Sequence, residues 1–222
     1  MVVIVDYQMG NLRSVQKAFE RVGTPATITD NPREILAAER LVLPGVGAFP
    51  DAMRELQQRD LVAVLKDYVA SGRPMLGICL GMQLLFDSSR EFGDHDGLGI
   101  IAGSVEPFDL PDPLKVPHMG WNLSQVPTAF HLRATHPVFQ PLAEQPRFFY
   151  YVHSFYCRPQ DPGIVALEAD YGGWFAGAIA RDNIVATQFH PEKSQSDGLE
   201  LLRRFAMWTP QPTMTIKRLS RS

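Results

Sequence analysis

The chain has 222 residues, 45% of them hydrophobic and 20% charged, and a formal net charge of -3, values typical of a soluble globular protein with one large domain or two small ones. No basic stripe indicates nucleic-acid binding, no apolar run approaches the roughly 20 residues of a membrane span, and the N-terminus lacks the features of a signal peptide. Two cysteines cannot form a disulfide scaffold, so we expect a reduced, cytoplasmic protein with neither a nucleic-acid nor a membrane partner.

Strand and helix patterns alternate along the first 86 residues. Short apolar runs predict strands that are buried on both faces, and amphipathic segments with capping and stop residues predict helices. In chain order we expect a strand at 1–6, a helix capped by Asn11 and ended by Gly23, a strand at 26–29, a short helix from Asn31-Pro32, a strand at 41–43, helices at 50–59 and 61–71, and a strand, tight turn and helix at 75–86. This alternation favours right-handed βαβ units and a parallel sheet.

The pattern changes in the second half of the chain. We expect loops at 92–103 and 107–117, antiparallel strands at 147–157, 164–169, 175–180 and 184–189, a helix at 197–208, and a disordered tail from 210. The predicted fold class is α/β with three layers: an open, mainly parallel sheet flanked by helices, with added antiparallel strands. It forms one domain over 1–209, followed by the tail 210–222.

The turn at 77–81 reads Gly-Ile-Cys-Leu-Gly, the thiol version of the Gly-x-Ser-x-Gly nucleophile elbow. A tight strand-to-helix turn strains the backbone at the nucleophile and leaves no room for side chains two residues away, which explains both glycines. The N-terminus of the following helix would stabilise negative charge on the sulfur of Cys79. The same motif alone is compatible with a buried structural cysteine, so its partners decide the matter.

A candidate base follows the apolar run 184–189, at His190-Pro191-Glu192. Residues i and i+2 of an extended chain project to the same side, so Glu192 can orient one ring nitrogen of His190 while the other faces Cys79. The remaining histidines lack metal-ligand spacing, and we expect neither a metal nor a cofactor.

Two glycines, Gly45 and Gly47, follow the strand expected at 41–43. A dinucleotide-binding loop would need a third glycine at position 50, which is Pro50, so we reject that interpretation. Two interpretations stay open for this loop, either a plain turn or a set of backbone N–H groups that face the nucleophile.

Together these motifs resemble the signature of class I (triad) glutamine amidotransferases, and more narrowly the glutaminase subunits of imidazole glycerol phosphate synthases from histidine biosynthesis. The narrower resemblance covers roughly residues 1–209 and rests on the segments 6–11, 43–49, 117–122, 152–156 and 189–194. The chain departs from that family at Gln8, where glycine is usual.

The resemblance implies a glutaminase in which Cys79 attacks the side-chain amide of glutamine, His190 transfers protons and Glu192 orients the imidazole. It assigns the oxyanion hole to backbone N–H groups of Leu80 and of Val46 or Gly47. The residues that it assigns to substrate binding are Gln83, His153, Ser154 and Phe155.

The resemblance also implies a partner, a (β/α)₈-barrel cyclase subunit that receives ammonia and makes imidazole glycerol phosphate and aminoimidazole carboxamide ribotide. The candidates for contact with that subunit are Asn11, Met119, Trp121, Tyr150 and Lys193. Two other functions stay open, a stand-alone γ-glutamyl hydrolase of the same fold and a catalytically silent interaction subunit.

Overall fold

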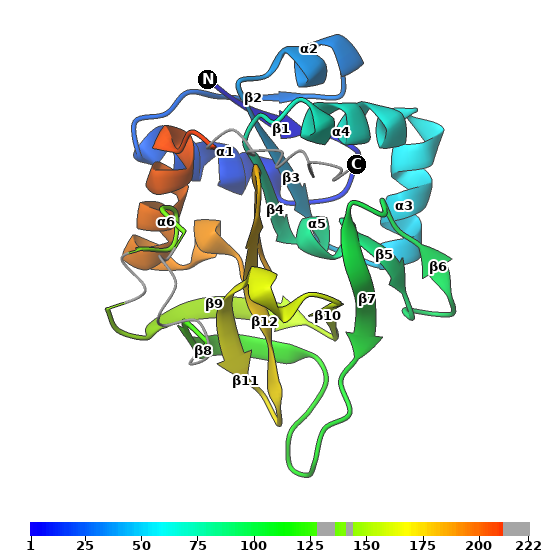
Figure 1. Ribbon diagram of the computed structural model, residues 1–222, viewed down its shortest axis with the longest axis vertical. Coiled ribbons are helices and arrows are strands. Elements are labelled where there is room, and N and C mark those ends of the chain that lie inside the picture. Colours follow the sequence, from blue (N-terminus) through cyan, green and yellow to red (C-terminus); the bar gives the residue numbers. More distant parts are fainter. Residues whose placement is uncertain (128–135, 141–143, 211–222) are drawn as a thin grey trace, which may run out of the picture.

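A computed structural model describes residues 1–127, 136–140 and 144–210 of the chain. A nine-stranded sheet in the order β2-β1-β3-β4-β13-β12-β11-β8-β9 runs through the molecule (Figure 1). Its first five strands pair in parallel: β2 (Ala26–Thr29), β1 (Val2–Val5), β3 (Arg40–Gly45), β4 (Met75–Cys79) and β13 (Ile184–Thr187). The other four pair antiparallel: β12 (Trp174–Arg181), β11 (Val165–Asp170), β8 (His118–Gln125) and β9 (Arg147–His153).

Helices cover both faces of the parallel half. The helices α1 (Leu12–Arg21) and α6 (Gln195–Met207) pack together on one face, where Phe19 and Phe205 meet edge to face. The opposite face carries α2 (Pro32–Ala37), α3 (Phe49–Gln58) and α4 (Leu61–Ala70). Every residue of β1 is buried, as expected of a strand covered on both sides. The predicted three-layer α/β fold with antiparallel additions is therefore confirmed.

A second sheet of four strands, in the order β10-β7-β5-β6, packs beside the first. Its strands are β10 (Phe155–Pro159), β7 (Ile101–Pro107), β5 (Phe86–Ser89) and β6 (His95–Asp96). The sequence did not predict β6 or β7, because 92–103 is rich in glycine and was expected to be a loop. It also did not predict β8, which lies directly after the proline-rich segment.

Helix α5 (Leu80–Gln83) is only four residues long, whereas the sequence pattern predicted a helix up to Phe86. The helix ends early because other amides take the carbonyl oxygens that would continue it. Leu98 donates to the carbonyl of Leu84, and Ile100 and Ile101 donate to that of Leu85. The chain then enters β5.

The interpretation of 184–189 as an antiparallel addition is also wrong. Strand β13 pairs antiparallel with β12, but it pairs in parallel with β4, from Ile184 beside Met75 to Thr187 beside Ile78. It is the fifth strand of the parallel core, and its carboxyl end points the same way as that of β4. The run 147–157 divides at Ser154 into β9 and β10, which belong to different sheets.

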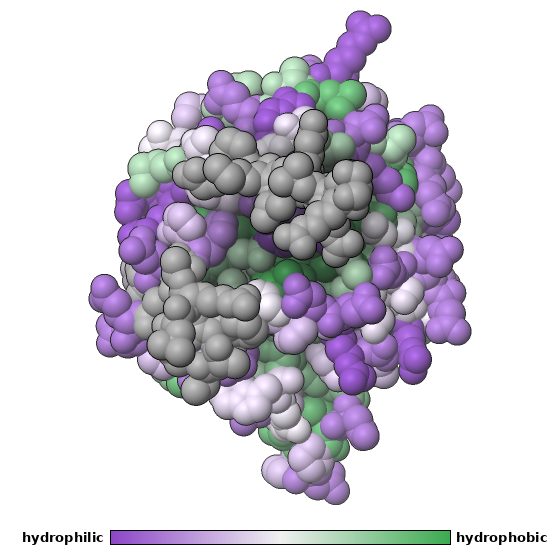
Figure 2. Space-filling view, viewed as in Figure 1, coloured by the Kyte–Doolittle hydropathy of each residue, from purple (hydrophilic) through white to green (hydrophobic). Residues whose placement is uncertain are grey.

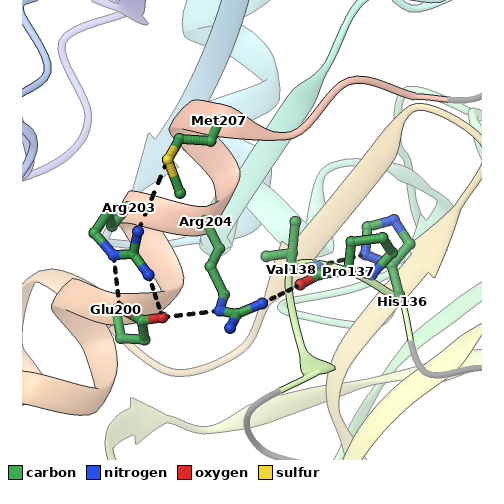
Figure 3. Close-up of polar contacts among 7 residues, drawn as sticks. All are labelled: His136, Pro137, Val138, Glu200, Arg203, Arg204 and Met207. Atoms are coloured by element: carbon green, nitrogen blue, oxygen red, sulfur yellow. Dashed lines mark hydrogen bonds and ion pairs between the residues drawn. The ribbon is translucent and has the colours of Figure 1, made fainter.

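Of the two predicted asparagine caps, one forms a capping hydrogen bond and the other does not. The side chain of Asn31 accepts a hydrogen bond of 2.9 Å from the N–H of Arg33 and caps α2. Asn11 occupies the N-cap position of α1, but its side chain makes no capping hydrogen bond. On α6, Glu200 holds Arg203 and Arg204, and Arg204 donates to the carbonyl of Pro137 at 3.1 Å (Figure 3).

Hydrophilic residues cover most of the periphery of the face shown in Figure 2, and apolar residues gather toward its centre and lower end. Within the described ranges, no helix combines the length and apolar character needed to cross a membrane. Residues 211–222 of the expected disordered tail 210–222 lie outside the described residues, and the domain boundary at 209 stays a prediction.

Candidate active site

Cys79 sits in a strained turn at the end of β4. Its backbone has φ 54° and ψ -112°, a conformation that residues other than glycine rarely adopt. A side chain at Gly81 would overlap the carbonyl oxygen of Leu43 on the neighbouring strand, and one at Gly77 would come within 3.0 Å of the carbonyl oxygen of Gly81. The two glycines are therefore required for close approach, as the elbow interpretation predicts.

Three parallel strands bring the candidate residues to one edge of the sheet. In the register of β3 and β4, Gly45 lies beside Cys79, so the loop after β3 starts next to this cysteine. In the register of β4 and β13, Thr187 lies beside Ile78, so the segment after β13 arrives at the same place. Chemistry in open α/β sheets collects at such carboxyl ends.

His190 and Glu192 form a buried pair, with Nδ1 of the histidine 2.8 Å from Oε1 of the carboxylate and side chains only 2% and 1% exposed. Burial alone would lower the pKa of His190, but the charge of Cys79 and polar contacts with Cys79 and Glu192 outweigh it and raise this pKa to about 10. The second carboxylate oxygen of Glu192 is buried without a hydrogen-bond partner in the described chain. This environment favours a positively charged imidazole.

The other ring nitrogen of His190, Nε2, is buried and makes no well-aligned hydrogen bond within the described residues. We therefore attribute the interaction between His190 and Cys79 to electrostatic attraction. An Nε2 atom without a fixed partner can exchange protons with a substrate that enters between the two side chains.

A cavity of about 280 Å³ opens at Cys79. It brings together most of the residues that the sequence singled out: Val46, Gly47, Cys79, Leu80, Gln83, His153, Ser154 and Phe155. Gly47 has φ 107°, so the loop after β3 turns in a conformation that suits glycine. The loop is thus not a plain turn away from the site, because its backbone lines the same cavity as the nucleophile.

Gln83 is held by two acceptors. Its Nε2 donates to the carbonyl of Phe155 at 3.0 Å and to Oε1 of Gln188 at 3.1 Å. Sequence reasoning missed Gln188, which is fully buried and lies 3.8 Å from the sulfur of Cys79. The sequence feature that could have indicated Gln188 was a large amide side chain in the mainly apolar run 184–189.

Glu91 also lines the cavity, and sequence reasoning missed it because nothing in the segment around it marks a site. Burial raises the pKa of Glu91, and the N–H of Phe49, which donates to its Oε2 at 2.7 Å, partly opposes that rise. Glu91 is therefore a carboxylate that lines the same cavity as Cys79, with one oxygen bonded to the backbone.

Two buried histidines form a chain of hydrogen bonds behind the cavity wall. The carbonyl of Phe155 can only accept, so the Nδ1 of His153, 2.8 Å away, carries a proton and its Nε2 accepts. His118 must then donate from Nδ1 at 2.9 Å, and its Nε2 accepts from Asn122 at 3.2 Å. The hydrogen-bond partners of each imidazole determine its tautomer. This chain of hydrogen bonds fixes the backbone at 153–155.

Four of the five candidate interface residues lie on β8, β9 and the segment after β13. Met119 and Trp121 are 62% and 45% exposed, the ring of Tyr150 lies 6.2 Å from that of Trp121, and the ammonium of Lys193 lies 5.8 Å above the Tyr150 ring. These four residues are therefore neighbours. Asn11 is exposed at the start of α1, which contacts the turn at Pro191–Lys193.

Comparison with known proteins gives one family and a common fold. The family model for class-I glutamine amidotransferases matches residues 3–208. The chain is 55% identical over 210 residues to the imidazole glycerol phosphate synthase subunit HisH of Rhodopirellula baltica, covering 93% of this chain and 97% of that one. It is 51% identical over 210 residues to the subunit of the same name from Syntrophotalea carbinolica, covering 92% and 98%.

Solved structures share the fold at low identity. A glutamine amidotransferase crystal structure aligns with a TM-score of 0.71 at 18% identity, covering 93% of this chain and 98% of that one. The PurLQS structure from Thermotoga maritima aligns with a TM-score of 0.70 at 16% identity, covering 92% and 96%.

The histidine chain predicts a pH dependence of stability. Burial lowers the pKa of His118 to about 4, below its ordinary value of 6.5, and it is the main cause that lowers the pKa of His153 to about 3. The unfolded chain therefore takes up protons below pH 6.5 that the folded chain does not, so the free energy of unfolding should fall from pH 7 to pH 5. His118→Gln keeps a hydrogen-bond donor for His153 but does not titrate. Between pH 7 and pH 5 we therefore expect its free energy of unfolding to fall by about 1–2 kcal/mol less than that of the parent.

Chemical denaturation of both proteins at the two pH values measures this difference. An equal loss in the parent and in His118→Gln would show that His118 does not carry the effect.

Proposed function

We propose, because this chain belongs to the class-I glutamine amidotransferase family and within it to the HisH subunits of imidazole glycerol phosphate synthase, that it hydrolyses glutamine and supplies ammonia for histidine biosynthesis. One observation carries the proposal: the cavity that holds the Cys79 elbow adjoins a buried histidine–carboxylate pair at the same edge of the sheet. The family identity supports glutamine as the substrate, and the geometry supports Cys79 as the nucleophile, His190 as the proton carrier and the cavity as the binding site.

In the proposed mechanism, the Cys79 thiolate attacks the side-chain amide carbon of glutamine. His190 donates a proton to the departing ammonia, and it then accepts one from the water that attacks the thioester. Glu192 holds the imidazole in position and stabilises its charge. The oxyanion is stabilised by the N–H of Leu80, which follows the nucleophile, and by an N–H of the loop at Val46 and Gly47.

The cavity wall suits the amino-acid end of glutamine. The carboxylate of Glu91 would pair with the α-ammonium group. Gln83 commits its Nε2 to Phe155 and Gln188, which leaves its carbonyl oxygen as the atom available to a donor on the substrate. The backbone from His153 to Phe155 would hold the α-carboxylate.

An exposed apolar surface suits the partner subunit. Met119, Trp121 and Leu123 alternate along the outer face of β8, and Phe148 is exposed beside Leu123 on β9. Such a surface is uncommon on a protein that acts alone. We infer that it docks on a (β/α)₈-barrel cyclase subunit, so that ammonia passes between the subunits without taking up a proton from bulk water. The two free cysteines favour the cytoplasm as the compartment.

Replacement of Cys79 tests the central proposal. In complex with the cyclase subunit, Cys79→Ala should lose glutamine-dependent turnover completely, because no other group can form the thioester. Turnover with added ammonium salt should persist, because ammonia then reaches the cyclase without hydrolysis of glutamine. Loss of both activities would indicate a structural role for Cys79, and full glutaminase activity of the parent chain without a cyclase subunit would favour a stand-alone hydrolase.

Replacement of Glu91 separates binding from chemistry. Glu91→Gln keeps an oxygen that accepts from Phe49 but loses the negative charge, so we expect the KM for glutamine to rise about tenfold, with kcat within about twofold of the parent. Glu20→Gln, on the exposed face of α1, makes the same charge change away from the cavity and serves as the control. A fall in kcat at unchanged KM would count against this role.

The apolar surface predicts which substitutions weaken the complex. Phe148→Glu places a charge at a side chain that is 57% exposed, and we expect it to weaken binding of the cyclase subunit at least tenfold, measured by titration calorimetry. The thermal midpoint of the isolated chain should change little, because the residue has few contacts to lose. Trp174→Glu changes another exposed apolar residue, on β12, and should bind like the parent. Equal weakening by both variants would contradict the assigned surface.

A further inference from the structure

Gln188 is a buried polar residue beside the nucleophile, and the triad mechanism makes no use of it. The residue has no exposed surface. Its Oε1 accepts from Gln83 at 3.1 Å, and its Nε2 donates to the sulfur of Cys79 at 3.8 Å. A sulfur atom with an N–H donor beside it is a better site for negative charge than one in an apolar wall.

The direction of this donor follows from a fixed backbone carbonyl. The oxygen of Phe155 can only accept, so Gln83 must present its Nε2 to it, at 3.0 Å. The same nitrogen of Gln83 contacts Gln188, which must therefore present its oxygen. The remaining end of the Gln188 amide, its Nε2, then points to Cys79. The sulfur receives an N–H in this arrangement, and a reversed amide would break two hydrogen bonds.

Gln188 and His190 are both held in place by backbone hydrogen bonds. The N–H of Gln188 donates to the carbonyl of Gly177 on β12 at 2.8 Å, and Gly177 has no room for a side chain because the hydroxyl of Tyr151 lies 2.6 Å from where a Cβ would be. Gln188 stands two residues before His190. One short segment therefore brings both groups to the sulfur.

We propose that Gln188 is a further catalytic residue, which donates a hydrogen bond to the Cys79 sulfur and is oriented for this role by Gln83 and Phe155. The inference rests on the proposed function in that Cys79 is the nucleophile. Before attack, the N–H stabilises the thiolate. When water adds to the thioester and the C–S bond breaks, the electron pair returns to sulfur, and the same N–H stabilises it there.

Among the residues that the structure describes, three titratable groups interact with the charge of Cys79: His190 after β13, Tyr7 after β1 and Cys157 on β10. Burial raises the pKa of Tyr7 above the range of an ordinary tyrosine, and burial also raises the pKa of Cys157 well above that of a free thiol. Neither ionises near neutral pH. The reactivity of Cys79 between pH 6 and pH 9 therefore reports on its own sulfur and on His190.

The test is the rate at which iodoacetamide alkylates Cys79, followed by mass spectrometry from pH 6 to pH 10. Gln188→Met keeps the length of the side chain and removes the donor, and we expect the rate at pH 7 to fall about tenfold, with the difference vanishing toward pH 10. Gln188→Glu adds a buried negative charge and should lower the rate at pH 7 further. The control Gln57→Glu adds the same charge on the exposed side of α3 and should match the parent. A folded Gln188→Met with the parent's rate profile would overturn the proposal.

A measurement without substitution at Gln188 covers the case in which its variants do not fold. In NMR spectra of the protein with isotope-labelled glutamine side chains, one amide proton resonance should shift over the same pH range in which the rate of Cys79 alkylation changes. This shift should be absent in Cys79→Ala. No responding amide would overturn the proposal. Alkylation and resonance shifts need neither glutamine nor a cyclase subunit, so a chain that fails as a glutaminase can still support the role of Gln188, and an active one can still refute it.

Discussion

The contact on which the site depends is the close approach of the turn after β4 to strand β3. The backbone of Gly81 lies against the carbonyl of Leu43 so tightly that no side chain fits, and this proximity holds Cys79 in a strained conformation at the edge of the sheet. The same approach places Leu80 and the loop at Gly47 around one cavity. The strain is maintained because strands on both sides of β4 fix its register, so the surrounding sheet and not the turn itself stabilises the backbone conformation of Cys79.

Strand β13 completes the site because it is parallel to β4. A hairpin from β12 would ordinarily extend the antiparallel half of the sheet, yet β13 inserts beside β4 and delivers its carboxyl end to Cys79. The chain beyond it carries, within five residues, an amide that contacts the sulfur, the imidazole of His190 and the carboxylate of Glu192 that contacts this imidazole. A one-residue shift of β13 would reverse the side to which each of these groups points.

Strand β8 carries two different surfaces on its alternate residues. His118 and Asn122 face inward and belong to the hydrogen-bond chain that fixes the backbone at 153–155, whereas Met119 and Trp121 face outward on the apolar surface. The hydrogen-bond chain behind the cavity wall and the proposed docking surface are therefore on two sides of one strand. Its neighbour β9 shares this property, since it links exposed Phe148 to buried His153.

Features that depend on neighbours along the chain could be predicted from the amino-acid sequence alone. The glycines on either side of Cys79 belong to a short motif, and the spacing of His190 and Glu192 follows from the geometry of an extended backbone, so the residue order is enough to identify both. The contact that excludes a side chain at Gly81, the carbonyl of Leu43 on β3, is set by the tertiary structure. The parallel placement of β13, the strand β8 and the second sheet could not be predicted in this way, because each depends on pairing between segments far apart in the chain.

The proposed roles of Gln188 and Glu91 and the tautomers of His118 and His153 likewise depend on the tertiary structure. A buried amide, a carboxylate or an imidazole acquires its role from the atoms that the fold places beside it. Here those atoms come from other segments: the sulfur beside Gln188 ends β4, the N–H that holds Glu91 begins α3, and the carbonyl that sets the histidine tautomers begins β10.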